Sequence, residues 1–437
     1  MAKAATPTTS PISNAQYIRE TVESIIVAFI LAFLFRAFVA EAFVIPTGSM
    51  APTLMGAHKD ITCFESGERY QVGASNEFDK DTGEKIQRYV VGSTSSLSRA
   101  VNPIDFEDRN HETFSGDRIL VSKFDYVLSS PKRWDVIVFK YPANARQNFI
   151  KRLVGLPNEE LMIHEGDIFV RRSEAEPWTI ARKPPHKLLA MRQPVSDTNH
   201  LSKSLISLGF PSLWQNWSSD NLPGWTVEQN AQGWTAQLQS SNSPSWLRYY
   251  HKTLSEKEWL GVERDKQIPL TAPQDSSLVT DYLAYNSYNE LHQAVQMDVK
   301  SLVENLRRSD NGMHWVGDLF AEFNIEIQSD SGQLMLQAYE FGIEFRMTIE
   351  VKTGEAKLEA FDAIKPDRPL IQDIFSGQPD VIAATQIRGK GSYNLAMANV
   401  DDQILVWING SLVKFNQPAE YTKRSSPSDC SSALLVR

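Results

Sequence analysis

Cysteine is nearly absent from this sequence, which has two cysteines, Cys63 and Cys430, among 437 residues. A disulfide framework needs several cysteine pairs, and a zinc site built from cysteines alone needs four thiolates. The sequence therefore excludes both. We expect no metal site and no other cofactor.

Positive charge is also scarce. The chain has 44 lysines and arginines against 53 acidic residues, a formal net charge of -9, and no long basic run. This charge balance argues against electrostatic binding of nucleic acid. The content of hydrophobic residues, 42%, and of charged residues, 22%, is that of a globular protein. The length is sufficient for two to three domains with their own cores.

Long apolar runs are limited to one, from Ile25 to Phe35, which continues with interruptions at Arg36 and Glu41. It predicts a transmembrane anchor over residues 22–40 after a cytoplasmic tail, residues 1–21. A cleaved secretory signal would need a small-x-small site after the run, where large residues stand instead. An amphipathic core helix would need a polar face that the run lacks. The flanking charges are balanced, so they do not determine which side of the membrane holds the rest of the chain.

A serine between two prolines follows the anchor, in Pro46-Thr47-Gly48-Ser49-Met50-Ala51-Pro52. The prolines stiffen the approach, which suits a nucleophile, and Gly48 permits a close backbone approach to a substrate. The N–H of Ser49 and the hydroxyl of Thr47 are candidate donors to an oxyanion. An ordinary turn rich in serine and proline could have the same sequence, so this segment alone does not distinguish a nucleophile from a structural turn.

Three short β-rich runs follow, residues 119–124, 136–139 and 149–154, each bounded by turn residues. Branched and aromatic residues in such runs are typical of strands. They predict a β scaffold.

Four motifs stand in order along this part of the chain: G-S-M-x-P-T-L at Ser49, then G-D-R-x-L-V-x-K-F, D-V-I-V-F-K-Y-P and I-K-R-x-V-G-L-P. Together with the anchor they resemble bacterial type I signal peptidase, a membrane-bound Ser/Lys endopeptidase, over residues 17 to 192. The resemblance implies a catalytic domain over residues 41–192, held on the extracytoplasmic side of the cytoplasmic (inner) membrane by a single span. It also implies that the chain cleaves signal peptides from exported preproteins after small residues.

The resemblance assigns the nucleophile to Ser49 and the general base to Lys151. A lysine acts as a base only when neutral, so its pKa must fall from about 10.4 to near the working pH, which desolvation can achieve. Phe149 and Leu153 stand on the same strand face as Lys151 and are expected to exclude water from its amine. The positions that match the family's substrate contacts are Ile45, Met50, Leu54, Phe149 and Ile150.

Other candidate bases are less suited. Lys123 and Lys140 match scaffold positions of the family, and surface exposure explains them. A Ser-His-Asp triad would require His58, His111 or His164 to reach Ser49, although each is typical of a polar surface residue. A cytoplasmic Ser/Lys autoprotease of the repressor type is disfavoured, because a membrane segment stands in place of a DNA-binding head.

The sequence departs from the family in three places. Residues 59–115 form an inserted subdomain, and Trp134 stands where the family usually has glycine. The family's closing motif, G-D-N-R-x-x-S-x-D-S-R, is not found, and residues 423–437 resemble a low-complexity tail. We therefore expect this chain to show weak or no peptidase activity at neutral pH, although both Ser49 and Lys151 are present. The alternative is a catalytically incomplete binding protein that recognises a glycan or a protein.

The second half has a different pattern. Residues 171–200 are rich in Arg, Lys and Pro and predict an exposed connection. Alternating apolar and polar residues at 321–328 and 345–352, and a hairpin with an Asn-Gly turn at 404–413, predict antiparallel strands. This hairpin, with Trp-Ile-Asn-Gly at 407–410, loosely resembles those of concanavalin- or laminin-G-like jelly rolls. The resemblance implies a β-sandwich over residues 193–422, with a glycan or protein ligand or a purely structural role. Residues 281–307 have apolar residues at helical spacing and predict a helix.

The predicted fold is mainly β. It comprises an N-terminal transmembrane helix, a signal-peptidase-like β catalytic domain and an inserted antiparallel β-sandwich.

Overall fold

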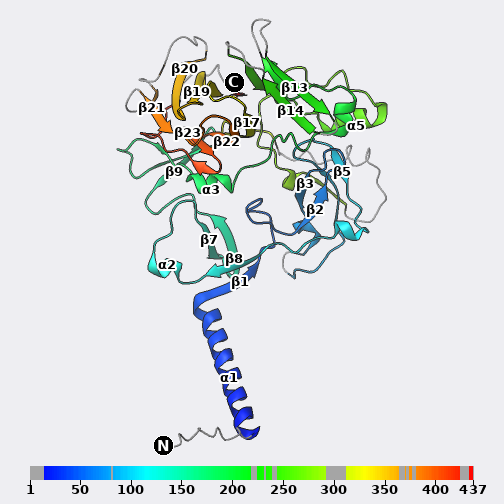
Figure 1. Cartoon of the computed structure of the whole chain (residues 1–437). Coiled ribbons are helices and arrows are strands. Elements are labelled where there is room, and N and C mark those ends of the chain that lie inside the picture. The colour runs from blue at the N-terminus through cyan, green and yellow to red at the C-terminus, as the bar shows by residue number, and fades with distance from the viewer. Residues whose placement is uncertain are drawn as a thin grey trace, which may run out of the picture.

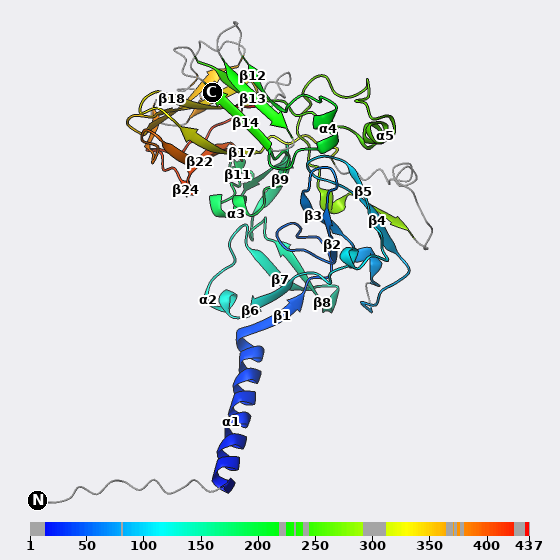
Figure 2. The ribbon, with the colours of Figure 1, turned by 45° about the vertical axis from the view of Figure 1, so that its right-hand side comes forward.

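The computed structural model describes residues 14–79, 82–217, 224–230, 233–238, 244–291, 312–363, 370, 374–375, 380–423 and 433–436. Over these residues the chain is mainly β, with one seven-stranded sheet and several smaller sheets, all antiparallel. One apolar helix projects from the β body (Figures 1 and 2). The prediction of a mainly β chain with an N-terminal apolar helix is confirmed.

The projecting helix α1 spans Asn14–Leu34 and continues as a π-helical segment, Phe35–Val39, before the backbone becomes extended at Ala40. No glycine or proline interrupts it, so nothing in the sequence breaks the helix. Gln16–Val39, 24 residues, is long and apolar enough to cross a membrane, and it does not pack against the body. At 1.5 Å per residue it measures about 36 Å, more than the ~30 Å of a hydrocarbon core.

Small sheets next to the helix form the part of the chain that contains the four motifs. The three predicted strands are present as β6, β7 and β8, the last two forming a hairpin. β1 leaves α1 and pairs with β6, which joins the helix directly to the β scaffold. The bounds are β1 Ala40–Val44, β6 Arg118–Ser122, β7 Val136–Tyr141, β8 Asn144–Arg152, β9 Glu160–His164, β10 Asp167–Arg171 and β11 Thr179–Ile180, with a short helix α2, Asp125–Leu128.

A second unit forms around residues 58–115 and recruits residues from much later in the chain. β16 pairs with β4, and Trp259 of helix α5 is 1% exposed in a core that also contains Ile61 and Tyr70. The core of the predicted inserted subdomain therefore includes residues from beyond position 193. The bounds are β2 His58–Thr62, β3 Arg69–Gly73, β4 Tyr89–Thr94, β5 Val101–Pro103, β16 Tyr288–Leu291, α4 Lys203–Ser207, α5 Glu256–Asp265 and the 3-10 segments η2 Ser75–Glu77, η3 Arg109–His111 and η4 Ala284–Asn286.

The helix predicted over residues 281–307 is wrong in its described part, residues 281–291. There the chain forms the 3-10 turn η4 and then the strand β16. Pairing with β4 supplies backbone hydrogen bonds that outweigh a weak local helical preference. Residues 292–307 lie outside the described residues.

Two larger sheets share one core at the end of the molecule away from α1 (Figure 1). Alternate residues such as Phe345, Met347 and Ile349 of one sheet and Met397 and Val406 of the other are buried in it. The predicted strands and the hairpin turn at Asn409 and Gly410, both with positive φ, are present. That this region is an inserted β-sandwich stays a prediction. The seven-stranded sheet has β12 Trp214–Trp217, β15 Trp246–Tyr249, β25 Ala433–Val436, β18 Gln333–Glu340, β19 Ile343–Glu350, β20 Glu355–Asp362 and β21 Val381–Ala384; the four-stranded sheet has β17 Leu319–Ile327, β22 Gly391–Val400, β23 Gln403–Ile408 and β24 Ser411–Leu412; β13 Trp225–Asn230 and β14 Gly233–Leu238 form a separate hairpin.

Two segments differ from their predicted role as exposed chain. Within residues 171–200, β11 pairs with β10, and Leu188 of helix α3 (Pro185–Leu189) is 5% exposed and packs on Ala398 and Trp407. The prediction of an exposed connection therefore holds for residues 172–177, which are exposed, and is wrong for the part that follows, because Ala181 and Leu188 are buried there. In the predicted tail, the backbone of residues 433–436 forms β25 between β15 and β18.

Candidate active site

The loop that carries Ser49 is closed at its two ends by Asp117. The Ile45 N–H donates to the Asp117 carbonyl at 3.0 Å, and the Met55 N–H donates to the Asp117 carboxylate at 2.7 Å. The Asp117 N–H donates in turn to the Met55 carbonyl at 2.9 Å. Sequence reasoning did not place Asp117 in the site, although it stands in the G-D-R motif.

Gly116 allows the loop that carries Ser49 to pack closely against the backbone of the G-D-R segment. Its φ is +95°, a backbone conformation that residues with a side chain rarely adopt, and a Cβ atom there would lie 2.0 Å from the Ile45 carbonyl oxygen. The glycine of the G-D-R motif is thus needed for backbone packing against residues 45–55, the loop that carries the predicted nucleophile Ser49 (the nucleophile loop).

Lys151 meets Ser49 across 102 residues of sequence. Its Nζ donates to Ser49 Oγ at 2.7 Å and to the Ile150 carbonyl at 2.9 Å. Strand β8 positions it, with Lys151 opposite Ile137 of β7. The predicted nucleophile and base are therefore brought together.

The expected shielding of the Lys151 amine is not observed. Lys151 and Ser49 are both exposed, and the Lys151 Nζ lies 5.6 Å from the centre of the Phe149 ring, which is itself 36% exposed. Leu153 is half-buried. Alternation along a strand predicts which side chains share a face but not whether that face is covered, and here, within the described residues, it is open.

Arg152 links the nucleophile loop to the turn before β7. Its guanidinium donates to the Trp134 carbonyl at 3.1 Å and to the Thr53 hydroxyl at 3.4 Å, and burial lowers its pKa. Trp134 has a φ of 72°, which explains why the family has glycine there. Its ring is buried and donates to the Arg182 carbonyl at 2.9 Å, so tryptophan repacks this turn against the following segment.

The remaining predicted site residues lie in this loop or on β8, and they differ in exposure. Ile45 and Met50 are buried, Leu54 and Ile150 are half-buried, and Thr47 is exposed beside Gly48. Ile45 and Met50 are thus positioned as loop core, whereas Leu54, Phe149 and Ile150 remain reachable from the surface.

The alternative bases have other partners. Lys123 forms an ion pair with Glu41 at 2.9 Å, and Lys140 is exposed. The His58 ring nitrogen Nδ1 lies 2.7 Å from the Gly56 carbonyl, and His111 contacts Asp105. His164 lies edge-on to Phe169. These contacts account for the candidates without a catalytic role.

Cys63 is buried and has its Sγ 3.3 Å from the Ser98 hydroxyl. Ser95 donates to the buried Glu68 carboxylate at 2.6 Å, and Ser96 also donates to it. These hydrogen bonds join Glu68, which precedes β3, to the turn that follows β4.

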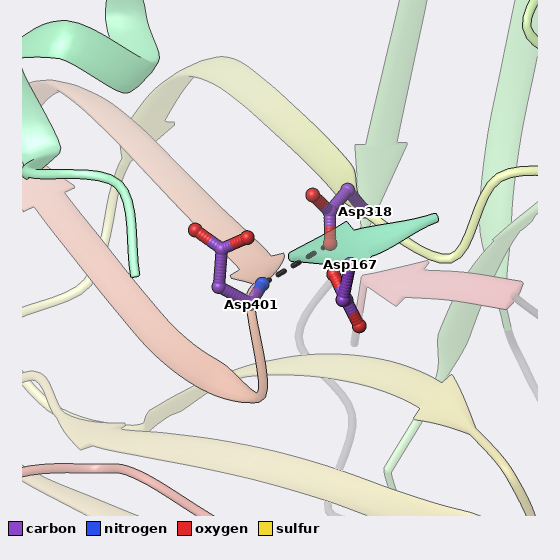
Figure 3. Close-up of side chains that lie close together, drawn as sticks. All are labelled: Asp167, Asp318 and Asp401. Carbon is purple, nitrogen blue, oxygen red and sulfur yellow. Dashed lines mark hydrogen bonds between the residues drawn. The ribbon is translucent and has the colours of Figure 1, made fainter. Parts of the chain in front are cut away.

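A group of three carboxylates that are close enough to hold a metal ion lies elsewhere, where β10, β17 and the turn after β22 meet. One carboxylate oxygen from each of Asp167, Asp318 and Asp401 lies within 4.8 Å of the others. The Asp401 N–H donates to the Asp318 carboxylate at 3.1 Å, the hydrogen bond drawn as a dashed line in Figure 3. Two lysines already supply counter-charges: Lys183 pairs with Asp318 at 3.2 Å and with Asp401, and Lys423 pairs with Asp167 at 2.7 Å. We therefore assign no metal to these residues.

Burial is the largest influence on the pKa values of the carboxylates in and beside this cluster. It raises the pKa of Asp167 to about 6, although Lys423 opposes the rise. It also raises the pKa of Glu340 and Asp402, which lie 3.4 and 3.3 Å from the Lys423 amine. Burial alone would lower the pKa of Lys423, but attraction to Glu340 and Asp167 raises it above its ordinary value.

Comparison with known proteins gives one family. Residues 18–79 and 95–206 match the family described as signal peptidase, peptidase S26, and these segments contain Ser49 and Lys151. The probable signal peptidase I-1 of Synechocystis sp. (strain ATCC 27184 / PCC 6803 / Kazusa) is 25% identical over 193 residues, 42% of this chain and 68% of that protein. Signal peptidase I of Rickettsia bellii (strain OSU 85-389) is 28% identical over 154 residues, 35% of this chain.

The chain spans 40% of the length of the Rickettsia bellii protein. Among solved structures, a carbohydrate binding module from Bacillus subtilis is similar over 28% of this chain and 67% of that chain, with 13% identity and a TM-score of 0.20. So low a score carries no argument about fold or ligand. The sequence matches support a signal peptidase, at low identity and over part of the chain.

Proposed function

We propose that this chain is a membrane-anchored serine endopeptidase that removes signal peptides from exported preproteins after small residues. The observation that supports it best is the 2.7 Å contact between Lys151 Nζ and Ser49 Oγ. Similarity to signal peptidases over residues 18–79 and 95–206 supports the substrate class.

The chemistry follows from the two side chains. When the Lys151 amine is neutral, the Ser49 hydroxyl donates its hydrogen bond to Nζ and loses its proton there as Oγ attacks the scissile carbonyl carbon. The peptide bond then breaks, and the proton passes from Lys151 to the leaving amine. Water, activated by the same amine, releases the signal peptide from Ser49.

Substrate binding supplies the dry surroundings that the free site lacks. Lys151 is exposed, and a neutral amine is favoured only when water is excluded. A signal peptide bound over Ser49 would cover both side chains. Leu54, Phe149 and Ile150 are reachable from the surface and are proposed to line its small-residue pockets.

The test is cleavage of a preprotein with an A-x-A site by the purified full chain in detergent. We expect a single cut after the second alanine, identified by the N-terminal sequence of the product. No cleavage at any pH, with a preprotein that an established signal peptidase cuts, would contradict the proposal and would favour the binding protein.

Thr47 is proposed to donate its hydroxyl to the oxyanion, together with the Ser49 N–H. Thr47→Val keeps the shape of the side chain and removes the donor. Loss of one such donor is expected to lower kcat by about 10²- to 10³-fold with little change in KM. An unchanged kcat would assign the oxyanion to backbone N–H groups.

Helix α1 is proposed to cross the cytoplasmic membrane, with the β body on the outer side. We expect the chain to stay with membranes in alkaline carbonate, and protease added to spheroplasts to digest the β body. Release by carbonate would contradict the anchor, whereas protection from protease would place the body on the other side.

A further inference from the structure

The aromatic ring of Tyr285 packs against the backbone beside the proposed nucleophile. A Cβ atom built on Gly48 would lie 2.0 Å from Cε1 and 2.5 Å from the hydroxyl oxygen of Tyr285. Real Cβ atoms do not approach so closely, so no side chain fits at position 48 while the ring is in place. Ser49 is the next residue.

The ring also contacts the strand behind the loop. A Cβ atom on Gly73, the last residue of β3, would lie 2.8 Å from Tyr285 Cε1. The Tyr285 hydroxyl donates to the Ala57 carbonyl at 3.3 Å. Burial raises the pKa of this hydroxyl to about 12, so it remains protonated and a donor. The ring therefore lies between the nucleophile loop and β3.

The segment that supplies Tyr285 is itself firmly held. Tyr285 lies in η4, immediately before β16, which pairs with β4. The Thr94 N–H donates to the Ser287 carbonyl at 3.1 Å, and the Tyr282 hydroxyl donates to the Thr94 carbonyl at 3.2 Å. Tyr285 is 6% exposed. A rigid element distant in sequence thus buttresses one side of the loop, while Asp117 closes its ends.

We propose that Tyr285 is a positioning residue, whose ring fixes the Gly48 backbone and thereby holds Ser49 within reach of Lys151. This inference rests on the proposed function. It gives the later half of the chain a part in the active site, because displacement of η4 would release the loop. Misplacement of a reacting group by about 1 Å is enough to slow an enzyme about 100-fold.

The first experiment measures kcat and KM on the preprotein for four variants. Tyr285→Phe keeps the ring and is expected to stay within about threefold of the parent, whereas Tyr285→Ala is expected to lower kcat about 10- to 100-fold with KM little changed. Gly48→Ala should also lower kcat strongly. In the double variant Gly48→Ala with Tyr285→Ala, the change at position 48 should lower kcat much less than it does in the parent, because the ring that the new Cβ atom would meet is absent. If Gly48→Ala lowers kcat by the same factor in the parent and in the Tyr285→Ala variant, the inference is overturned.

The matched control is Tyr339→Ala. Tyr339 is a half-buried tyrosine of β18 whose hydroxyl donates to Glu344 at 3.1 Å, away from the nucleophile loop. We expect it to lower the unfolding temperature without changing kcat. A fall in kcat as large as that of Tyr285→Ala would show a general effect of destabilisation and would overturn the positioning role.

A second measurement does not depend on activity. Amide hydrogen exchange in the full chain should become faster over residues 46–57 in Tyr285→Ala than in the parent and in Tyr339→Ala. Unchanged exchange there would overturn the inference even if the enzyme is active. If the parent chain does not cleave preprotein but exchange increases as expected, the proposed function fails while the role of the ring stands.

Discussion

Replacement of Ser49 by alanine is expected to abolish preprotein cleavage, and so is replacement of Lys151 by alanine or arginine. Ser49→Ala removes the attacking oxygen, and Lys151→Ala removes the only amine that the structure hydrogen-bonds to it among the described residues. Lys151→Arg keeps the positive charge but cannot supply a neutral base, because a guanidinium is not deprotonated near neutral pH. The measurement is kcat/KM on the preprotein, with a loss of at least about 10³-fold expected.

Lys140→Ala is the matched control, since Lys140 is an exposed lysine of the same β hairpin. It should leave kcat/KM unchanged. All variants should retain the parent's circular dichroism spectrum, because Ser49 and Lys151 lie at the surface. Substantial turnover by Lys151→Arg would assign the base to another group.

The expectation of weak or no cleavage at neutral pH stays a prediction. It is tested by preprotein cleavage by the parent chain from about pH 7 to about pH 10, since a general base acts only in its unprotonated form. Full activity at neutral pH would contradict it.

Local patterns sufficed for the parts of the fold that local physics determines. Period-two alternation predicted β17 and β19, and the Asn-Gly pair predicted the turn between β23 and β24. The ordered motifs predicted that Ser49 and Lys151 meet, because each motif comes with a known place in a family scaffold. None of these predictions required knowledge of distant partners.

The errors share one cause, which is that distant segments decide the local environment. The 281–291 segment pairs with β4 instead of forming a helix, and Tyr285 reaches the Gly48 backbone. Leu188 of helix α3 is buried against strands that follow about two hundred residues later. No periodicity in a sequence reports which strand will pair with which, since register depends on faces that only the assembled fold presents.

Lys423 is also placed by partners distant in sequence, and its replacement is expected to lower the stability of the fold strongly. It pairs with Asp167, 256 residues away, and with Glu340 and Asp402, at a side-chain exposure of 17%. Lys423→Met fills similar space but leaves three buried carboxylates without their shared cation. Breaking a buried ion pair in this way costs about 3–5 kcal/mol. We expect a marked fall in the unfolding temperature of the β body at about pH 8.

The loss should shrink in acid, and the sign follows from the raised carboxylate pKa values. The pKa of Asp167 is about 6 in the folded parent, above its ordinary value of 3.8, so the folded state binds more protons than the unfolded state between these values. Stability from this group is therefore greatest below that window and is lost as the pH rises through about 6. Without Lys423 the carboxylates should hold their protons to still higher pH, which makes the variant's stability fall more steeply between about pH 5 and about pH 8.

Two variants separate the buried charge from general damage to this region. Lys414→Met removes an exposed lysine nearby in sequence and should change stability by less than about 0.5 kcal/mol. Asp167→Asn combined with Lys423→Met removes one of the uncompensated charges and should recover part of the loss at about pH 8 but little at about pH 5, where Asp167 is already protonated in the folded state. An equal loss in Lys423→Met at both pH values, with no recovery in the double variant, would mean that Lys423 stabilises the fold by packing alone. Recovery confined to the higher pH would instead identify this lysine as the counter-charge that joins β10 to the turn between β22 and β23.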